Sequence, residues 1–260
     1  MKTALTIAGS DSGGGAGIQA DLKTFAAHGV YGTCAITAVT AQNTLGVEAA
    51  ESISVELIVA QVNAVVDDIG VDAVKTGMLA TPDIVERVAA LLPSLPTPHV
   101  VVDPVMIAKS GARLLAEEAI DAVRRLLLPR ATVVTPNAME AEVLAKIEID
   151  SLSSAREAAR RIYDFGTGTV VIKGGHIPTA DAVDLVYDGR EYLELSGPRL
   201  PSRHTHGTGC TFAAAIAANL ALGLPTPDAI SGAKHYVAQA IRHGLPLGRG
   251  HGPLGHFWQR

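Results

Sequence analysis

The residues best suited to chemistry form the heptapeptide His204-Thr205-His206-Gly207-Thr208-Gly209-Cys210, which opens a run of small residues with helical character. A glycine-rich turn at the start of a helix can direct several backbone N–H groups toward one anion, and the helix dipole adds to that field. Gly207 and Gly209 permit close approach because neither carries a Cβ, and Cys210 lies where the dipole favours a thiolate. The turn predicts a phosphate site. A tight turn before a closely packed helix is the alternative, and the motif alone favours neither.

Composition indicates one sizeable domain that binds neither nucleic acid nor membrane. The chain has 260 residues, of which 48% are hydrophobic and 4% aromatic, enough for a large aliphatic core. A net charge of −5 without any Lys/Arg cluster argues against nucleic acid and anionic membranes. No apolar stretch could span a bilayer, and the apolar N-terminal segment is too short for a signal peptide. Cys34 and Cys210 make no disulfide framework, so we expect a cytoplasmic protein.

Short β-branched runs alternate with amphipathic segments along most of the chain. The predicted strands are Thr3 to Ala8, Gly32 to Val39, Ala73 to Met78, His99 to Asp103, Thr132 to Thr135 and Thr169 to Lys173. The predicted helices are Ala16 to His28, Val55 to Asp67, Asp83 to Leu92, Glu117 to Leu128, Ala138 to Ala145 and Ser154 to Phe165. This alternation predicts a doubly wound α/β fold whose mostly parallel central sheet carries helices on both faces.

The last third of the chain changes character. Ala182 to Asp188 and Glu191 to Ser196 predict an antiparallel hairpin joined at Asp188-Gly189-Arg190, and two helices follow it. No internal repeat, charge run or low-complexity linker interrupts the sequence. We therefore expect a single domain over residues 1–260.

Candidate site residues follow several of the predicted strands. Asp103 could hold Mg²⁺ or cap a turn. Asn137 and Glu140 have the spacing of a helix capping box, and their polar groups could also reach a metal. Lys173 precedes two glycines, which suits a polyphosphate as well as a solvated turn. Because the carboxyl ends of parallel strands meet at one edge of the sheet, these residues point to one crevice.

Of two common nucleotide-binding loops, one loses support and the other is excluded. The loop after the first strand has Gly13 and Gly15, but Ile18 stands where a dinucleotide-binding loop needs its third glycine. No Gly-x-x-x-x-Gly-Lys-Ser/Thr sequence occurs in the chain, so a P-loop is excluded.

Taken together, these segments resemble the ribokinase-like superfamily, and most closely its branch of hydroxymethylpyrimidine and phosphomethylpyrimidine kinases of thiamine biosynthesis. The resemblance covers essentially the whole chain. Its matching segments, in chain order, are residues 4–11, 13–24, 40–44, 75–79, 102–106, 135–137, 173–176, 204–210 and 251–254. It implies a three-layer α/β/α fold with a small β lid or hairpin. It also implies that ATP phosphorylates 4-amino-5-hydroxymethyl-2-methylpyrimidine to the monophosphate and then to the pyrophosphate.

The resemblance also assigns roles around the phosphates. The turn of Gly207, Thr208 and Gly209 would form the anion hole. Asp103 and Glu140 would organise Mg²⁺ on ATP, directly or through water, with Asn137, while Lys173, Asn137 and Thr208 would contact the nucleotide. Cys210 occupies the position of the aspartate base of sugar kinases, but incoming phosphates oppose its ionisation, so base catalysis is a hypothesis.

On the substrate side, the carboxamide of Gln42 offers an acceptor and a donor that match the amino group and ring nitrogen of the pyrimidine. By resemblance, Gly9 would let the ring approach, and Val39, Met78 and Val105 would form apolar walls. Residues 47–54 resemble a lid edge that pairs with a second subunit, which implies a homodimer, and the hairpin is expected to flank the nucleotide.

Three alternatives remain at this point. A pyridoxal or pyridoxine kinase on the same scaffold also phosphorylates a hydroxymethyl group on a six-membered aromatic ring, although Gln42 and Met78 favour the aminopyrimidine. A catalytically silent pyrimidine-binding protein would need neither Asp103 nor Lys173. A zinc site of His204, His206 and Cys210 lacks an evident fourth ligand.

Overall fold

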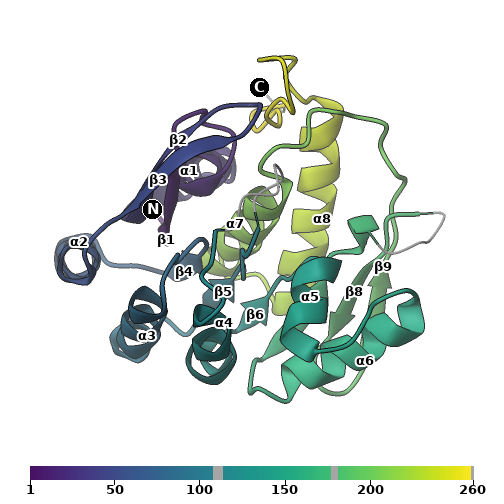
Figure 1. Ribbon diagram of the computed structural model, residues 1–260, viewed down its shortest axis with the longest axis horizontal. Coiled ribbons are helices and arrows are strands. Elements are labelled where there is room, and N and C mark those ends of the chain that lie inside the picture. The colour runs from purple at the N-terminus through teal and green to yellow at the C-terminus, as the bar shows by residue number, and fades with distance from the viewer. Residues whose placement is uncertain (108–113, 177–180, 259–260) are drawn as a thin grey trace.

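The computed structural model describes residues 1–107, 114–176 and 181–258, and its centre is a nine-stranded sheet (Figure 1). The strand order is β3-β2-β1-β4-β5-β6-β7-β8-β9. The strands are β1 (Thr3–Asp11), β2 (Tyr31–Gln42), β3 (Val47–Ser52), β4 (Ala73–Thr76), β5 (Val100–Val102), β6 (Val133–Val134), β7 (Thr169–Ile172), β8 (Asp184–Tyr187) and β9 (Tyr192–Leu195). Strands β2, β1, β4, β5, β6 and β7 are parallel, while β3, β8 and β9 run antiparallel to their neighbours. The predicted parallel sheet and the β8–β9 hairpin are confirmed.

Helices cover both faces of the sheet, as predicted. One face packs against α1 (Gly17–Ala27), α7 (Thr208–Ala221) and α8 (Thr226–Arg242). The other packs against α2 (Val55–Asp68), α3 (Pro82–Leu91), α4 (Ala119–Ala122), α5 (Ala138–Ala145) and α6 (Leu152–Tyr163). Val101 faces the first layer, whereas Val100 and Val102 face the second, as alternation along a strand requires. The fold is a three-layer α/β/α sandwich.

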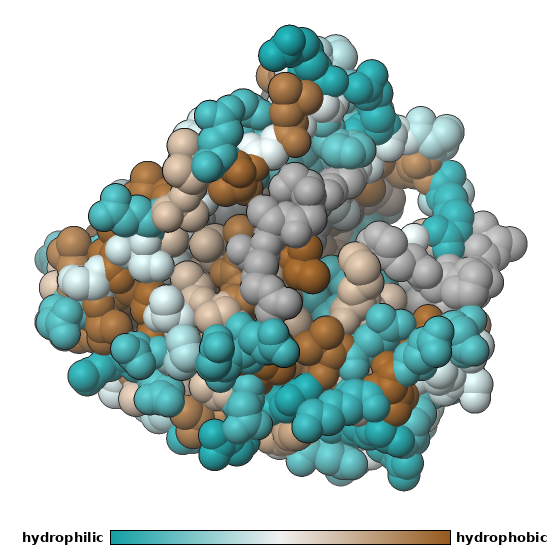
Figure 2. All heavy atoms as spheres, in the orientation of Figure 1, coloured by the Kyte–Doolittle hydropathy of each residue, from teal (hydrophilic) through white to brown (hydrophobic). Residues whose placement is uncertain are grey.

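The outer surface follows from the amphipathic pattern of these helices. In α6 the buried residues are Ala155, Ala158, Ala159 and Ile162, at helical spacing, while its arginines face outward. In Figure 2, hydrophilic residues predominate over the lower part of the view, where Figure 1 places α4 and α6. None of the helices within the described ranges is long and apolar enough to cross a membrane.

One predicted helix is present but is not α-helical throughout. The segment from Glu117 to Leu128 contains only the short helix α4, followed by a π turn over Val123–Leu127 and a 3-10 turn, Leu128–Arg130. Pro129 has no N–H with which to continue α-helical bonding, so the chain tightens there and enters β6. The other predicted helices agree with the structure to within about two residues at either end.

A fully buried ion pair fastens α1 to the centre of the sheet. Lys75 Nζ of β4 lies 2.8 Å from Asp21 Oδ2 of α1, and both side chains are 0% exposed. The hydroxyl of Thr6 donates to the same carboxylate oxygen at 2.7 Å, and Thr6 is the register partner of Lys75. Burial opposes the charge on Lys75, but Asp21, Cys210 and Asp103 together outweigh it and hold the pKa of Lys75 above its usual value. The pair therefore ties the middle of α1 to β1 and β4.

Candidate active site

The loop after β1 is organised by the carboxylate of Asp11. Its Oδ1 accepts from the backbone N–H of Gly13 at 2.8 Å, and its Oδ2 accepts from Gly15 and Ala16 at 3.0 and 2.8 Å. Burial raises the pKa of Asp11, but hydrogen bonds from His206 and from the backbone outweigh it, so the pKa lies below its usual value. Asp11 is therefore an ionised acceptor that holds this loop in one shape.

The turn before α7 interlocks with the same loop. His206 Nε2 lies 2.8 Å from Asp11 Oδ2, a contact across 195 residues of sequence. Gly207 has φ +82°, and a Cβ on it would collide with the carbonyl oxygen of Gly15. Gly207 is therefore required both for its backbone conformation and for the close approach.

The start of α7 is prepared to bind an anion. No side chain of the described residues caps its first turn, and no acidic residue lies there. The first N–H groups of a helix have no intrahelical partners, and the positive end of the dipole coincides with them. Thr208 turns its hydroxyl to the carbonyl of Thr205 at 2.8 Å, which braces the turn. The geometry suits the predicted phosphate site.

Asp103, Glu140 and Lys173 form a charged cluster beside this turn. Lys173 Nζ lies 3.0 Å from Asp103 Oδ1 and 4.0 Å from Glu140 Oε2. A Cβ on Gly209 would lie 3.1 Å from Lys173 Nζ and 3.7 Å from Asp103 Oδ2. The crevice expected at the carboxyl ends of β5, β6 and β7 thus brings these predicted residues together next to the first turn of α7.

The capping box at the start of α5 is present. The backbone N–H of Asn137 donates to Glu140 Oε2 at 2.7 Å, and that of Glu140 donates to Asn137 Oδ1 at 2.9 Å. Burial raises the pKa of Glu140 to about 7, Lys173 opposes the rise, and the nearby Asp103 adds to it. Because one oxygen of Glu140 already serves the backbone, it is better placed to act on a metal through water than as a direct ligand.

These carboxylates fit a magnesium ion that is held jointly with a nucleotide. Within the described parts of the chain, no three His, Cys, Asp or Glu side chains are grouped so that they could hold a metal by themselves. Mg²⁺ prefers oxygen ligands and is usually bound by one or two carboxylates together with water and phosphate oxygens. Asp103 and Glu140 supply that number of carboxylates beside the anion turn.

Burial opposes the thiolate that the helix dipole is expected to favour at Cys210. Burial is the main effect and raises the pKa of Cys210 to about 11. Lys75 lowers it, whereas Asp21 and Asp103 raise it further. Desolvation of the sulfur and two neighbouring carboxylates thus act against the dipole of the first turn. Cys210 is therefore a thiol at neutral pH.

The predicted substrate residues lie on the other side of the anion turn. Gln42 Nε2, at the end of β2, is 3.3 Å from His206 Nε2. A Cβ on Gly9 would lie 3.0 Å from Met78 Sδ, so these two residues are neighbours. Val39 is 48% exposed in β2 opposite Glu51, and Val105 is partly buried just beyond β5. The structure thus joins Gln42 to the anion turn through His206, and the wall roles stay predictions.

Sequence reasoning missed the residues that act through contacts distant in sequence. Asp11 was not singled out, His206 was considered only as a metal ligand, and Asp21 and Lys75 were not assigned any role. A carboxylate directly after a buried strand, within a run of glycines, was the available signal for Asp11. The buried pair offered none, because both residue types are usually exposed.

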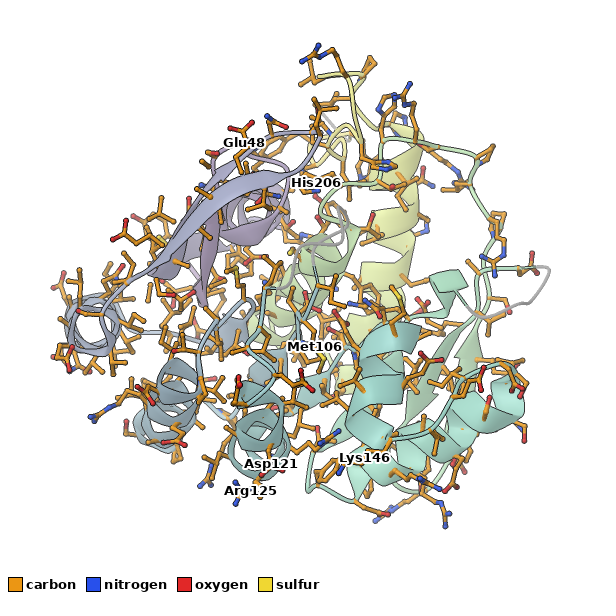
Figure 3. All side chains as sticks on the ribbon, viewed as in Figure 1. Glu48, Met106, Asp121, Arg125, Lys146 and His206 are labelled. Carbon is orange, nitrogen blue, oxygen red and sulfur yellow. The ribbon has the colours of Figure 1, made fainter. Side chains whose placement is uncertain are left out.

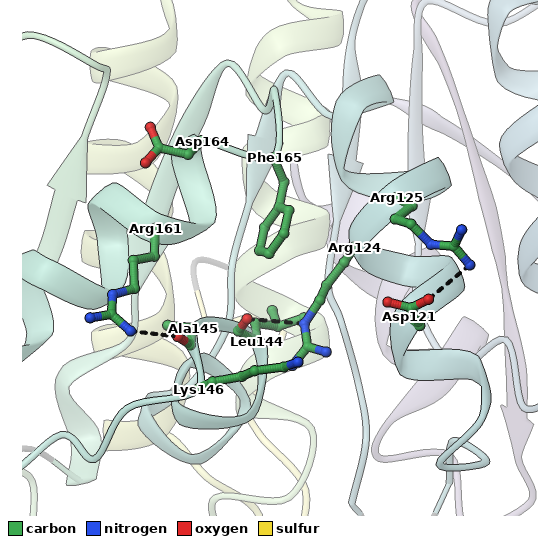
Figure 4. Close-up of a pocket in the computed structure, with 9 residues that line it drawn as sticks. All are labelled: Asp121, Arg124, Arg125, Leu144, Ala145, Lys146, Arg161, Asp164 and Phe165. Carbon is green, nitrogen blue, oxygen red and sulfur yellow. Dashed lines mark hydrogen bonds and ion pairs between the residues drawn. The ribbon is translucent and has the colours of Figure 1, made fainter.

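A separate pocket of about 460 Å³ lies at the other end of α5 (Figure 4). Arg124 donates to the carbonyl oxygens of Leu144 and Val143, and Arg161 donates to that of Ala145 at 3.3 Å. These carbonyls end a helix and lack intrahelical partners, so the guanidinium groups complete the helix. Figure 3 shows Lys146 of this pocket at the opposite end of the molecule from His206. The end of α5 thus engages Arg124 and Arg161, and Arg125 pairs with Asp121.

Known proteins are similar to this chain in sequence and in fold. The family model described as phosphomethylpyrimidine kinase matches residues 11–255. The chain belongs to the phosphomethylpyrimidine kinase family. A hydroxymethylpyrimidine/phosphomethylpyrimidine kinase of Streptomyces coelicolor is 54% identical over 98% of this chain and 94% of its own. A bifunctional thiamine biosynthesis protein of Geobacter sulfurreducens is 50% identical over 97% of this chain and 52% of its own.

Solved structures agree with the family and its fold. The structure of a Bacillus subtilis pyridoxal kinase in complex with ADP superimposes with a TM-score of 0.92 at 43% identity, over 98% of this chain and 97% of that one. The likeness confirms the predicted ribokinase-like architecture in this member of the phosphomethylpyrimidine kinase family.

Replacing Gly207 with Ala tests the anion turn of this phosphomethylpyrimidine kinase family member. The added Cβ meets the Gly15 carbonyl at a positive φ, so we expect ATP affinity to fall at least about tenfold, roughly 1.4 kcal/mol. Gly223→Ala is the matched control, since Gly223 has φ +90° at the other end of α7 and open space around it. It should cost about 1 kcal/mol of stability and leave ATP binding unchanged. Isothermal titration and urea unfolding measure both; equal ATP affinity in the two variants would contradict the site.

The ionisation of Cys210 can be measured by alkylation. In a Cys34→Ser variant we expect the rate of iodoacetamide modification at Cys210 to rise with pH toward a pKa of about 11, because burial disfavours the thiolate. Cys34, probed in a Cys210→Ser variant, gives the comparison, since burial alone raises its pKa. A Cys210 thiolate that forms below about pH 8 would show that the helix dipole prevails over burial.

Proposed function

We propose that the protein transfers the γ-phosphoryl group of ATP to 4-amino-5-hydroxymethyl-2-methylpyrimidine, and then transfers a second one to the monophosphate, in thiamine biosynthesis. The observation that carries the proposal is the contact of Gln42 with His206. It places a donor-and-acceptor carboxamide directly beside an uncapped helix start. The names of the family and of its relatives agree with this assignment.

The charges around the turn suit phosphoryl transfer. Catalysis of this reaction is largely positioning and stabilisation of charge on the transferred group. The N–H groups of Gly207, Thr208 and Gly209 would receive the γ-phosphate, while Lys173 and Asn137 would contact the nucleotide. Asp103 would hold Mg²⁺, with Glu140 acting through water. The ion would neutralise charge on the β and γ phosphates.

The proton of the substrate alcohol has to leave during the reaction. Cys210 is the predicted base, but it is itself protonated in the unliganded site. In a loose phosphoryl-transfer transition state the attacking oxygen gains little bond order early, so its proton can leave late. Cys210 would accept this proton only after releasing its own thiol proton to water, a loss that Lys75 and the bound cation would favour, and otherwise it orients the hydroxyl.

A pyridoxal kinase is the second candidate, because the Bacillus subtilis pyridoxal kinase structure covers nearly the whole chain with a TM-score of 0.92. Its substrate also carries a hydroxymethyl group on a six-membered ring. The aminopyrimidine is favoured because its amino group stands beside a ring nitrogen, as the two ends of Gln42 require.

We also propose that the chain is a single cytoplasmic domain that forms a homodimer. Strand β3 lies at the edge of the sheet and exposes residues 48–52. The outer edge of such a strand has unpaired backbone N–H and C=O groups, which can pair with a second copy of the chain. If they stay uncovered, they promote aggregation. Sedimentation velocity should give twice the mass of the 26.9 kDa chain, and a monomer at micromolar concentration would contradict the dimer.

The activity is tested by incubating the protein with MgATP and the aminopyrimidine alcohol, in parallel with pyridoxal, and reading products by mass spectrometry. We expect two successive phosphoryl additions to the pyrimidine. Lys173→Met should lower kcat at least about 100-fold, as loss of a charge-stabilising group does, and Lys146→Met, in the pocket beyond α5, serves as the control. Pyridoxal phosphate as the only product would identify a vitamin B6 kinase, and binding without any product would identify a silent binding protein.

A further inference from the structure

The side chain of Gln42 is held between two hydrogen-bonding groups. Its Nε2 lies 3.3 Å from His206 Nε2, and its Oε1 lies 3.2 Å from Thr40 Oγ1. Its backbone is clamped by Ser12, whose Oγ accepts from the Gln42 N–H at 2.7 Å and donates to the Gln42 carbonyl at 2.8 Å. The place of this carboxamide is fixed. A half turn about its last bond would exchange only the oxygen and the NH₂ group.

Asp11 decides where His206 carries its ring hydrogen. The carboxylate of Asp11 accepts three backbone N–H groups and also faces His206 Nε2 at 2.8 Å. An ionised carboxylate has no hydrogen to donate, so the hydrogen between these two atoms belongs to His206 Nε2. Gly15 makes the contact possible, since a Cβ there would lie 2.5 Å from His206 Cδ2.

The two neighbours of Gln42 then require the same orientation of its amide. An NH₂ group facing the Nε2–H of His206 would set two donors against each other, whereas the amide oxygen can share the hydrogen that His206 donates to Asp11, as the longer arm of a bifurcated bond. Thr40 has a single hydroxyl hydrogen, which goes to the carbonyl of Ser10 at 2.8 Å. Its oxygen is therefore left as an acceptor for the NH₂ group of Gln42. Both constraints are met only when the oxygen faces His206.

We propose that His206, held by Asp11, is a positioning residue that fixes the Gln42 carboxamide with its oxygen toward His206 and its nitrogen toward Thr40. The second lone pair and the second N–H of the amide then present one donor–acceptor order to the ligand before it binds. A ring with an amino donor beside an acceptor nitrogen matches this order. A 4-oxo ring, with a carbonyl beside an N–H, would need the amide turned against both neighbours, and this penalty creates specificity. The identity of the ring rests on the proposed function, whereas the orientation of the amide does not.

Substrate discrimination provides the first test. Steady-state kinetics would compare the aminopyrimidine alcohol with its 4-oxo analogue in the wild type and in His206→Phe. We expect the wild-type ratio of kcat/KM to favour the amino ring, and His206→Phe to lower that ratio about tenfold, mainly through KM, because loss of one oriented hydrogen bond costs about that factor. His206→Gln, which restores an N–H donor, should recover most of the ratio.

A matched control separates this role from structural support. His235→Phe makes the same change on the exposed side of α8 and should leave the ratio as in the wild type. If His206→Phe lowers kcat/KM for both rings equally, His206 only supports the loops and the proposal is overturned.

The second test needs neither substrate nor activity. In the unliganded protein with ¹⁵N-labelled histidine, NMR at neutral pH should show a one-bond ¹⁵N–¹H coupling at His206 Nε2. An unprotonated Nε2 would overturn the proposal, because Gln42 would then donate to it and face the other way. A chain that carries this proton but phosphorylates neither ring would contradict the proposed function while supporting the orientation of Gln42.

Discussion

The carboxylate of Asp11 is the interaction on which the candidate site depends. It accepts three backbone N–H groups of the loop after β1 and also binds the imidazole of His206 before α7. A buried carboxylate without such partners would be too costly to keep ionised, so the loop and the histidine must both be in place for the charge to persist. One charge therefore sets the shape of the first loop, the position of the anion turn and the surroundings of Gln42.

Beneath these loops, Asp21 and Lys75 supply a rigid base. Desolvation of a fully buried pair cancels much of its attraction, so such a pair contributes little net stability. Breaking it by removing one partner is costly, and for that reason it holds α1, β1 and β4 at fixed distances. Lys75 also bears on the chemistry, since it lowers the pKa of Cys210 against the effects of burial and two carboxylates.

Local patterns were enough to predict most of the fold. Continuous apolar runs gave the parallel strands, and Asn137 with Glu140 gave the start of α5 together with its capping box. The predicted α-helix from Glu117 to Leu128 was only partly confirmed. The apolar spacing continues to Pro129, but the backbone changes to π and 3-10 turns before it. Two site properties depended on distant partners. No local sequence pattern indicates the contact of His206 with Asp11. The pKa of Cys210 depends on burial and on the charges of Lys75, Asp21 and Asp103, which are distant in sequence.

The interlocked loops also determine when the protein becomes able to bind its ligands. His206 contacts Asp11, 195 residues away in sequence. Near the C-terminus, the N–H of Gly250 donates to the hydroxyl of Thr44, 206 residues away. A chain emerging from the ribosome can pair β1 through β7 before either contact exists, since those strands are complete by Ile172. The sheet can thus form on the nascent chain while the anion turn is still unmade. The phosphate site can therefore form only once the C-terminal quarter, which supplies both the anion turn and the helices α7 and α8 over one face of the sheet, has been made.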